Sequence, residues 1–355
     1  MRRSFPISLS LGFLLALSLA GAAQSLREEA DRAGILIGTA VNVAYLSEPA
    51  YTGTLAREFN LLEPEDAMKW AAIRTDEKTF NFADADRLVA FAEAHGMKVR
   101  GHTLVWGTDN PNWLTEGHFT PQQLSDLLHA HIQRVVGHFR DKVFAWDVVN
   151  EAFRQHGKLR DTLWYSQPGI GYAGNGTAYI EQAFRWAHEA DPHALLFYND
   201  ADAEGINAKS DAIYSMVQDF QRRGVPIDGI GFQMHLFNLA ADAVSIAANL
   251  ERFTKLGMQI HITEMDVALP VDASGRPLHP GDLERQAEVY HQIATVCLQH
   301  PGCTAFQTWG FTDKYSWLGW FTHGTQGDGL PFDRQYKPKP AYDALRRVFA
   351  MQRPQ

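Results

Sequence analysis

The sequence is poor in cysteine and has no long run of charges of one sign. Only two of its 355 residues are cysteines, and no Cys-x-x-Cys metal pattern occurs. The formal net charge is −9, with acidic and basic residues interspersed, which argues against nucleic acid or an anionic membrane surface as a partner. The chain also lacks internal repeats and low-complexity linkers. With 45% hydrophobic residues, it can bury a large core as a single domain.

One apolar run, at the amino terminus, suggests targeting. Arg2 and Arg3 precede the apolar stretch 5–20, which ends in small residues, and this is the pattern of a secretory signal peptide. The apolar stretch is too short for a comfortable membrane span. We therefore predict a signal peptide at residues 1–23 and one folded domain at 24–355. The mature protein should be secreted or periplasmic, without a membrane partner after cleavage.

The two cysteines, Cys297 and Cys303, lie six residues apart across Pro301 and Gly302. In an exported chain such a pair is expected to form a disulfide, and two unpaired thiols are the alternative. The closed loop is short, so the chain-entropy model gives a stabilisation of about 2–3 kcal/mol.

Eight apolar, strand-like runs alternate with amphipathic helical stretches. The helix after Thr120 should open with Pro121 in its first turn and Gln123 completing a capping box. This alternation without a break in composition predicts a single (β/α)8 TIM barrel, and a doubly wound open sheet is the alternative. The expected strands are 35–41, 59–63, 98–105, 143–149, 194–198, 229–235, 259–263 and 304–309.

The connections between these elements differ in length. Helix-to-strand turns are short, often a single glycine such as Gly96, Gly224 or Gly257, whereas strand-to-helix connections such as 154–177 and 311–339 are long. The long loops therefore gather at the carboxyl ends of the strands, where barrel enzymes keep their chemistry.

Two of these strand ends carry a glutamate. Glu151 closes the stretch 144–152 (F-A-W-D-V-V-N-E-A), and Glu264 lies in 259–266 (Q-I-H-I-T-E-M-D). Either carboxylate alone could be a structural acceptor, but two are the minimum for cleaving a glycosidic bond. One protonated carboxyl gives its proton to the leaving oxygen, and an ionised one attacks or directs water. His261 lies an odd number of residues from Glu264, so we expect it to face the helix layer in a structural role.

Other strand ends carry polar and aromatic residues that suit a sugar. Sugars offer hydroxyl groups, which polar side chains can bind, and apolar ring faces, which tryptophan can cover. The H-x-H strand motif of barrel metallohydrolases is missing, so we expect no metal and no cofactor. The residues concerned are Glu65, Lys69, His102, Trp106, Asn150, Gln233, His235, Trp309 and Trp317.

Two motifs resemble the signatures of a known enzyme family. The strings W-D-V-V-N-E-A (146–152) and I-T-E-M-D (262–266) are similar to the acid/base and nucleophile motifs of family-10 glycoside hydrolases, the endo-β-1,4-xylanases. The resemblance runs from Gly38 to Tyr342 and takes in P-E-D-A-M-K-W, V-R-G-H-T-L-V-W and G-I-G-F-Q-M-H. It thus covers nearly the whole mature chain, in the order that the family has.

This resemblance implies a role for each candidate residue. Glu151 would be the acid/base and Glu264 the nucleophile of a retaining double displacement, with His235 orienting the nucleophile. The family's cysteine pair also looks matched by Cys297 and Cys303. The expected sugar contacts are Glu65, Lys69, His102, Trp106, Asn150 and Gln233, with Trp309 and Trp317 as walls of the site.

Three positions depart from the family pattern. Asp66 stands where the family usually has asparagine, Gly107 where it usually has the histidine of H-S-Q, and Ala201 where it often has tyrosine. We predict a monomeric enzyme that hydrolyses internal β-1,4-xylosidic bonds in xylan. A β-1,4-glucanase or an enzyme confined to xylo-oligosaccharides is the first alternative, motivated by Asp66 and Gly107. A non-catalytic barrel that binds polysaccharide is the second.

Overall fold

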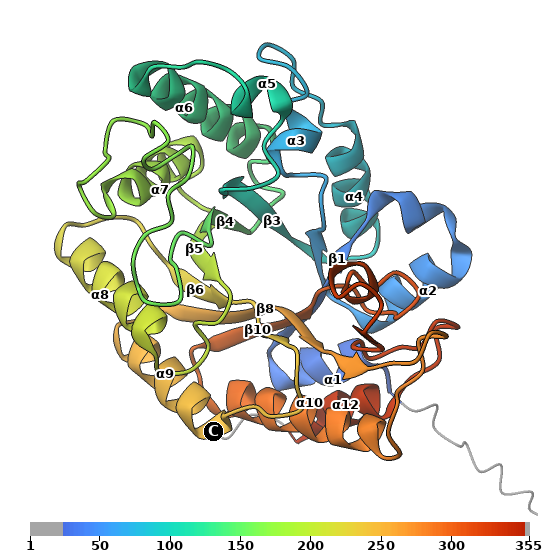
Figure 1. The fold of residues 1–355 in the computed structure, drawn as a ribbon. Coiled ribbons are helices and arrows are strands. Elements are labelled where there is room, and N and C mark those ends of the chain that lie inside the picture. Colours follow the sequence, from blue (N-terminus) through green and yellow to red (C-terminus); the bar gives the residue numbers. More distant parts are fainter. Residues whose placement is uncertain (1–23, 352–355) are drawn as a thin grey trace, which may run out of the picture.

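The computed structural model describes residues 24–351, and its centre is a closed barrel of eight parallel strands surrounded by helices (Figure 1). Neighbouring strands pair in the order β10-β1-β2-β3-β4-β5-β6-β8, and pairing between β8 and β10 closes the ring. The predicted (β/α)8 architecture is therefore confirmed. The barrel strands are β1 (Leu36–Val41), β2 (Leu61–Pro64), β3 (Lys98–Val105), β4 (Ala145–Asn150), β5 (Leu195–Asp200), β6 (Gly229–Phe232), β8 (Gln259–Val267) and β10 (Cys303–Thr308).

Three short strands and the helices complete the fold. Strand β7 (His235–Leu236) extends the edge of β8, while β9 (Leu269–Pro270) and β11 (Gln326–Gly327) form a small antiparallel pair. The helices are α1 (Leu26–Ala33), the 3-10 helix η1 (Val43–Ser47), α2 (Pro49–Glu58), α3 (Trp70–Ile73), α4 (Ala83–Ala94), α5 (Asn112–Thr115), α6 (Pro121–His138), α7 (Ala178–Ala190), α8 (Ala208–Arg222), α9 (Ala243–Lys255), α10 (Asp282–Gln299), α11 (Leu318–Phe321) and α12 (Pro340–Ala350).

Local sequence explains where these elements begin and end. The capping box at the start of α6 forms as predicted, because the Thr120 side chain accepts from the Gln123 backbone N–H and the Gln123 side chain accepts from the Thr120 N–H. Gly96, Gly224 and Gly257 have φ values of 61°, 62° and 78°, a left-handed conformation that glycine adopts without strain. The short helix-to-strand turns leave the long loops at the carboxyl ends of the barrel strands.

The predicted disulfide between Cys297 and Cys303 is present. It joins the last turn of α10 to the first residue of β10, and both cysteines are buried. The bridge therefore fastens one helix of the outer ring to the strand that follows it.

The prediction that one strand runs over 229–235 was wrong for its last residues. Strand β6 stops at Phe232, and Met234 adopts a left-handed φ of 65°, which a β-strand cannot continue through. His235 belongs instead to β7, where it pairs with Asp266. This break turns His235 toward the end of β8.

The orientation predicted for His261 was also wrong. Its Nδ1 lies 2.6 Å from Nη1 of Arg100, and its ring stacks on Phe197 with centroids 4.2 Å apart. The imidazole therefore lies among the residues that fill the barrel interior and does not face the helix layer.

A β-bulge explains this error. Phe306 of β10 pairs with Ile262 of β8, and the next pair is Thr308 with Met265. From one pair to the next, β10 therefore advances by two residues and β8 by three. The extra residue in β8 shifts the alternation of inward and outward side chains. As a result His261 and Glu264 both face the barrel interior, although they are separated by an odd number of positions.

The predicted signal peptide, residues 1–23, lies outside the residues that the structure describes. Within 24–351, no helix is both long and apolar enough to cross a membrane.

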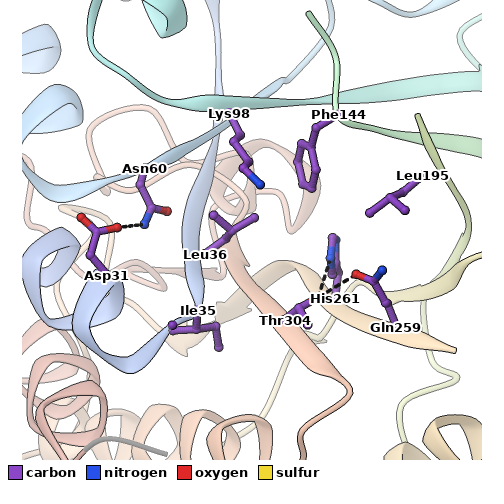
Figure 2. Close-up of a pocket in the computed structure, with 11 residues that line it drawn as sticks. Asp31, Ile35, Leu36, Asn60, Lys98, Phe144, Leu195, Gln259, His261 and Thr304 are labelled. Atoms are coloured by element: carbon purple, nitrogen blue, oxygen red, sulfur yellow. Dashed lines mark hydrogen bonds between the residues drawn. The ribbon is translucent and has the colours of Figure 1, made fainter. Parts of the chain in front are cut away.

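A cavity of 350 Å³ opens at the amino ends of the strands (Figure 2). Figure 2 shows Lys98 beside Phe144, with the Lys98 ammonium 4.9 Å from the ring centroid. Asp31, the acidic residue of this lining, accepts a hydrogen bond of 2.6 Å from Asn60. The remaining lining residues are Gly34, Ile35, Leu36, Leu195, Gln259, His261 and Thr304.

Candidate active site

The two candidate glutamates lie at the carboxyl end of the barrel. Glu151 directly follows β4, and its backbone N–H donates to the carbonyl of Asn199 at 2.9 Å. Its φ of 55° is unusual for a residue with a side chain, and such outliers concentrate at functional sites. Glu264 lies within β8 and is buried.

Two amide side chains connect these carboxylates. Glu151 Oε1 accepts from Gln233 Nε2 at 3.0 Å, and Glu264 Oε1 accepts from Asn199 Nδ2 at 2.7 Å. Both amides also donate to Asn150 Oδ1, at 3.2 Å from Gln233 and 2.9 Å from Asn199. Asn150 therefore occupies the centre of a network that fixes both carboxylates relative to one another.

Asn199 was not among the predicted site residues, although it stands at the end of β5. Thr263 Oγ1 donates to its Oδ1 at 2.8 Å and orients the amide so that its nitrogen reaches Glu264. Gly231 on the neighbouring strand makes room for it, because a Cβ there would lie 2.2 Å from Asn199 Oδ1. The signal in the sequence was the polar side chain at a strand end.

His235 joins Glu264 to a second acid. Its Nε2 lies 3.1 Å from Glu264 Oε2, and its Nδ1 lies 3.0 Å from Asp266 Oδ2. Trp317 Nε1 donates to the same Asp266 oxygen at 2.7 Å. Burial alone would lower the pKa of His235, but Asp266 and Glu264 outweigh it and raise the pKa well above its usual value. The ring is therefore an imidazolium.

This imidazolium keeps Glu264 ionised. Burial would raise the pKa of Glu264, but the hydrogen bond from His235, the charges of His102 and His235, and the Asn199 amide together lower it. This carboxylate is therefore poised to carry charge, as a group that attacks or stabilises a developing positive centre must be.

Beneath these groups lies a buried charged cluster inside the barrel. Arg100 binds the Asp147 carboxylate with Nε, at 3.2 Å, and with Nη2. His102 Nδ1 lies 3.0 Å from the same carboxylate and 3.4 Å from Glu63. A hydrogen bond at Nδ1 fixes the orientation of an imidazole and leaves Nε2 for another partner.

One group of side chains in residues 24–351 could in principle hold a metal ion. It consists of Glu63, His102 and Glu264, whose potential metal-binding atoms lie within 4.8 Å of one another. Burial and the charge of Asp147 raise the pKa of Glu63 well above its usual value, despite the opposing effect of Arg100. A protonated carboxyl is a poor metal ligand, and the guanidinium of Arg100 lies 3.8 Å from Glu63. The chemistry of this trio therefore does not favour a cation.

On the other side of the site, Lys69 is held between two aspartates. Its Nζ lies 3.1 Å from Asp66 Oδ1 and 3.2 Å from Asp109 Oδ2. The same ammonium lies 5.2 Å from the ring centroid of Trp106 and 5.7 Å from that of Trp309. Both aspartates lie in segments where the sequence departs from the family pattern.

Asp66 also acts on its neighbour Glu65. Burial raises the pKa of Glu65 to about 7, the charge of Asp66 adds to this rise, and Lys69 opposes it. Asp66 in turn accepts from Asn42 Nδ2 at 3.1 Å. Glu65 therefore changes its charge near neutral pH, next to the two carboxylates that hold Lys69.

Ring contacts join the remaining predicted residues to this centre. Trp309 lies 5.4 Å from His102 and 6.4 Å from His235, while Trp317 lies 4.8 Å from His235, between ring centroids. The structure thus places the sequence-derived candidates together at one end of the barrel. A parallel barrel with two strand-end carboxylates, amide donors and tryptophan walls defines the site of a glycoside hydrolase.

The family model described as Glycosyl hydrolase family 10 matches residues 25–348. The chain therefore belongs to glycosyl hydrolase family 10, as the motifs at Glu151 and Glu264 suggested.

Named relatives cover nearly the whole chain. Endo-1,4-β-xylanase B of Thermotoga neapolitana is 44% identical over 326 residues, which cover 91% of each protein. An endo-1,4-β-xylanase of Agaricus bisporus is 35% identical, with 87% of this chain and 89% of the relative covered.

Solved structures agree with this assignment. Native xylanase 10B from Thermotoga maritima superposes with a TM-score of 0.86 at 45% identity, covering 92% of this chain and 98% of the other. Xylanase 10B from Thermotoga petrophila, in complex with xylobiose, has a TM-score of 0.86 at 44% identity, covering 92% and 97%.

Proposed function

We propose that this chain is an endo-1,4-β-xylanase that cleaves xylan and xylo-oligosaccharides with net retention of configuration. The observation that carries this proposal is the hydrogen-bonded unit of Glu264, His235 and Asp266, linked to Glu151 through the amides around Asn150. Membership of family 10 and the xylanase names of the relatives support the substrate.

In the first step, the ionised Glu264 attacks the anomeric carbon while Glu151 donates a proton to the leaving glycosidic oxygen. A covalent glycosyl-enzyme forms, and the aglycone departs. In the second step, Glu151 takes a proton from water, which attacks the same carbon and releases Glu264. His235 bonds to Glu264 Oε2 and holds this carboxylate in the attacking orientation.

The surrounding residues bind the sugars. Asn150 lies beside Glu151 and is placed to hold the 2-hydroxyl group, a contact that strengthens in the transition state. The charged and amide residues bind hydroxyl groups, and the tryptophans cover ring faces. These residues are Glu65, Lys69, His102, Trp106, Gln233, Trp309 and Trp317.

Two measurements test the proposal. Purified protein should release reducing ends from glucuronoxylan, and proton NMR should detect the β-anomer as the first product. A folded protein that releases none would refute the proposed activity, and an inverted first product would refute the roles given to Glu151 and Glu264.

Hydrolysis of β-1,4-glucans is a second candidate, favoured by the pair Asp66 and Asp109 on Lys69. These carboxylates could alter the contacts of one sugar ring. The ratio of kcat/KM on an aryl xylobioside to that on an aryl cellobioside should then change by a factor that corresponds to about 1–3 kcal/mol. Comparing kcat/KM on the two aryl glycosides decides between the candidates.

We further propose that residues 1–23 direct export and that the mature enzyme is monomeric. The Cys297–Cys303 disulfide fits an oxidising compartment. Amino-terminal sequencing of protein from the periplasm or medium should find a chain that starts near residue 24, and light scattering should give the mass of one chain.

A further inference from the structure

Three large apolar side chains lie exposed beside the candidate site. Trp320, Phe321 and Phe237 are 81%, 51% and 37% exposed, and we call them the outer aromatic patch. Exposed aromatic groups that gather in one place, bordered by polar residues, mark binding surfaces more often than chance. Nothing in the mechanism above uses these side chains.

The outer aromatic patch continues directly from Trp317. The Phe321 ring lies 4.6 Å from that of Trp317, and the Phe237 ring lies 5.6 Å from Phe321 and 6.1 Å from Trp317. Trp320 and Phe321 follow Trp317 by three and four residues in one helical turn, a spacing that places side chains on one side. The patch therefore extends the tryptophan wall outward from Asp266 and His235.

The segment that carries the patch is held by its own hydrogen bonds. Leu318 is fully buried and anchors α11. Thr322 Oγ1 donates to the Leu318 carbonyl at 2.7 Å and accepts from the Gln326 N–H at 3.0 Å. Gln326 Nε2 donates to the carbonyl of Phe237 at 3.3 Å. A ligand that binds here meets side chains on an ordered backbone, which reduces the entropy lost on binding.

The segment 315–327, which carries Trp320 and Phe321, has no charged side chains, and this restricts what it can bind. Residues 315–327 contain no Asp, Glu, Lys or Arg, and their polar groups are hydroxyls, an amide and one histidine. A strongly charged partner would find no opposite charges in this segment. Aromatic faces with uncharged hydrogen-bonding groups suit a neutral sugar, which has apolar ring faces and hydroxyl edges.

We propose that the outer aromatic patch is a further saccharide subsite, which binds the continuation of the β-1,4-linked xylose chain whose reacting sugar lies at Glu264. The inference rests on the proposed function for the identity of the sugar. Trp317 would contact the sugar at the reacting centre, and Trp320 and Phe321 would stack on a sugar farther along the chain.

Chain-length dependence tests this subsite. We compare kcat/KM on xylohexaose, which can reach the patch, with kcat/KM on an aryl β-xylobioside. In Trp320→Ala/Phe321→Ala the ratio of these two values should fall about tenfold, because stacking on aromatic faces is lost from the long substrate alone. A ratio within about twofold of the unmodified enzyme's would overturn the proposal.

Two further variants keep the result interpretable. Trp320→Ala alone leaves the ring contacts of Phe321 with Trp317 untouched, and should still lower the ratio about threefold. Val244→Ala removes another exposed apolar side chain, 82% exposed on α9, and should not change the ratio. An equal loss in Val244→Ala would show a general surface effect and overturn the proposal.

Binding measured without turnover separates this inference from the proposed function. Electrophoresis in gels containing soluble xylan should retard the unmodified protein more than Trp320→Ala/Phe321→Ala. If the aryl xylobioside is not cleaved, the proposed function fails, whereas equal retardation of both proteins refutes the subsite alone. A lower particle mass of the double variant in light scattering would show contact between two copies, and this also overturns the subsite.

Discussion

The two ends of the barrel differ in what their strand ends carry. At the carboxyl end, Glu151 and Glu264 are joined by amide hydrogen bonds. At the amino end lies a 350 Å³ cavity whose acidic residue, Asp31, is engaged by Asn60. The lining of this open cavity holds one carboxylate, that of Asp31, and so lacks the pair of carboxyl groups that cleavage of a glycosidic bond needs. The comparison teaches that the placement of ionisable groups, more than the size of a cavity, identifies the reacting centre.

Two histidines, one at each end of the barrel, show the same contrast in their charge. His235, at the carboxyl end, has its pKa raised because Asp266 and Glu264 outweigh burial. His261, toward the amino end, has its pKa lowered well below its usual value by burial and by the charge of Arg100. The surrounding charges thus give an imidazolium at one end and a neutral ring at the other.

The largest effect expected at the carboxyl end follows loss of the attacking carboxylate. Glu264→Ala should reduce kcat on an aryl β-xylobioside by about 10⁴-fold or more, as removal of a catalytic nucleophile does in other hydrolases. Circular dichroism should show an intact fold. Activity within about tenfold of the unmodified enzyme would contradict the role of Glu264.

Removal of His235 should change both rate and pH dependence. His235→Gln should lower kcat by about 10²-fold, since one charged donor to Glu264 is lost. The pKa of Glu264 should rise, because His235 lowers it in the native protein. The acidic limb of the kcat/KM profile should therefore move to higher pH.

His261→Gln is the matched control at the other end. It also replaces an imidazole, but one whose neighbours are Arg100 and Thr304. The acidic limb should stay in place even if the melting temperature falls. An equal shift in both variants would mean that the two ends do not differ electrostatically as described.

A smaller change is expected at the Lys69 side of the site. Asp66→Asn removes a charge that raises the pKa of Glu65, so this pKa should fall below about 7. If Glu65 binds sugar in one charge state, the midpoint in a plot of KM against pH should move to lower pH. Asp109→Asn also removes a carboxylate from Lys69 and should shift the midpoint less. An unchanged midpoint in Asp66→Asn would contradict the proposed coupling.

The smallest effect on activity is expected at the amino end. Lys98→Ala removes the contact with Phe144 that lines the cavity, and should lower stability by about 0.5–1 kcal/mol. Its kcat/KM should stay within about twofold of the unmodified value. A large loss of activity without a loss of stability would mean that the amino-end cavity takes part in the function.

Much of the fold could be predicted because its signals are local. The alternation of strand and helix periodicity predicted the barrel, and the capping box at Thr120 predicted the start of α6. Glu151 and Glu264 were recognisable from motifs in which several neighbouring residues agree. The disulfide followed from cysteine spacing.

What the sequence did not reveal depends on pairing between distant segments. The bulge in β8 is visible only in its pairing with β10. The alternation of residues within β8 alone therefore predicted, wrongly, that His261 faces the helix layer. The role of Asn199 requires Gly231 and Thr263 from two other strands. These features involve residues far apart in sequence, which no single motif records.

Direct identification of the attacking residue tests the central claim. A 2-deoxy-2-fluoro-β-xylobioside with a good leaving group should form a glycosyl-enzyme that breaks down slowly, because fluorine destabilises the positively charged transition states of both steps. Mass spectrometry of the intact protein should show one added xylobiosyl group, and peptide mapping should place it on Glu264. A label on any other residue, or turnover without a trapped intermediate and with inverted product, would contradict the account.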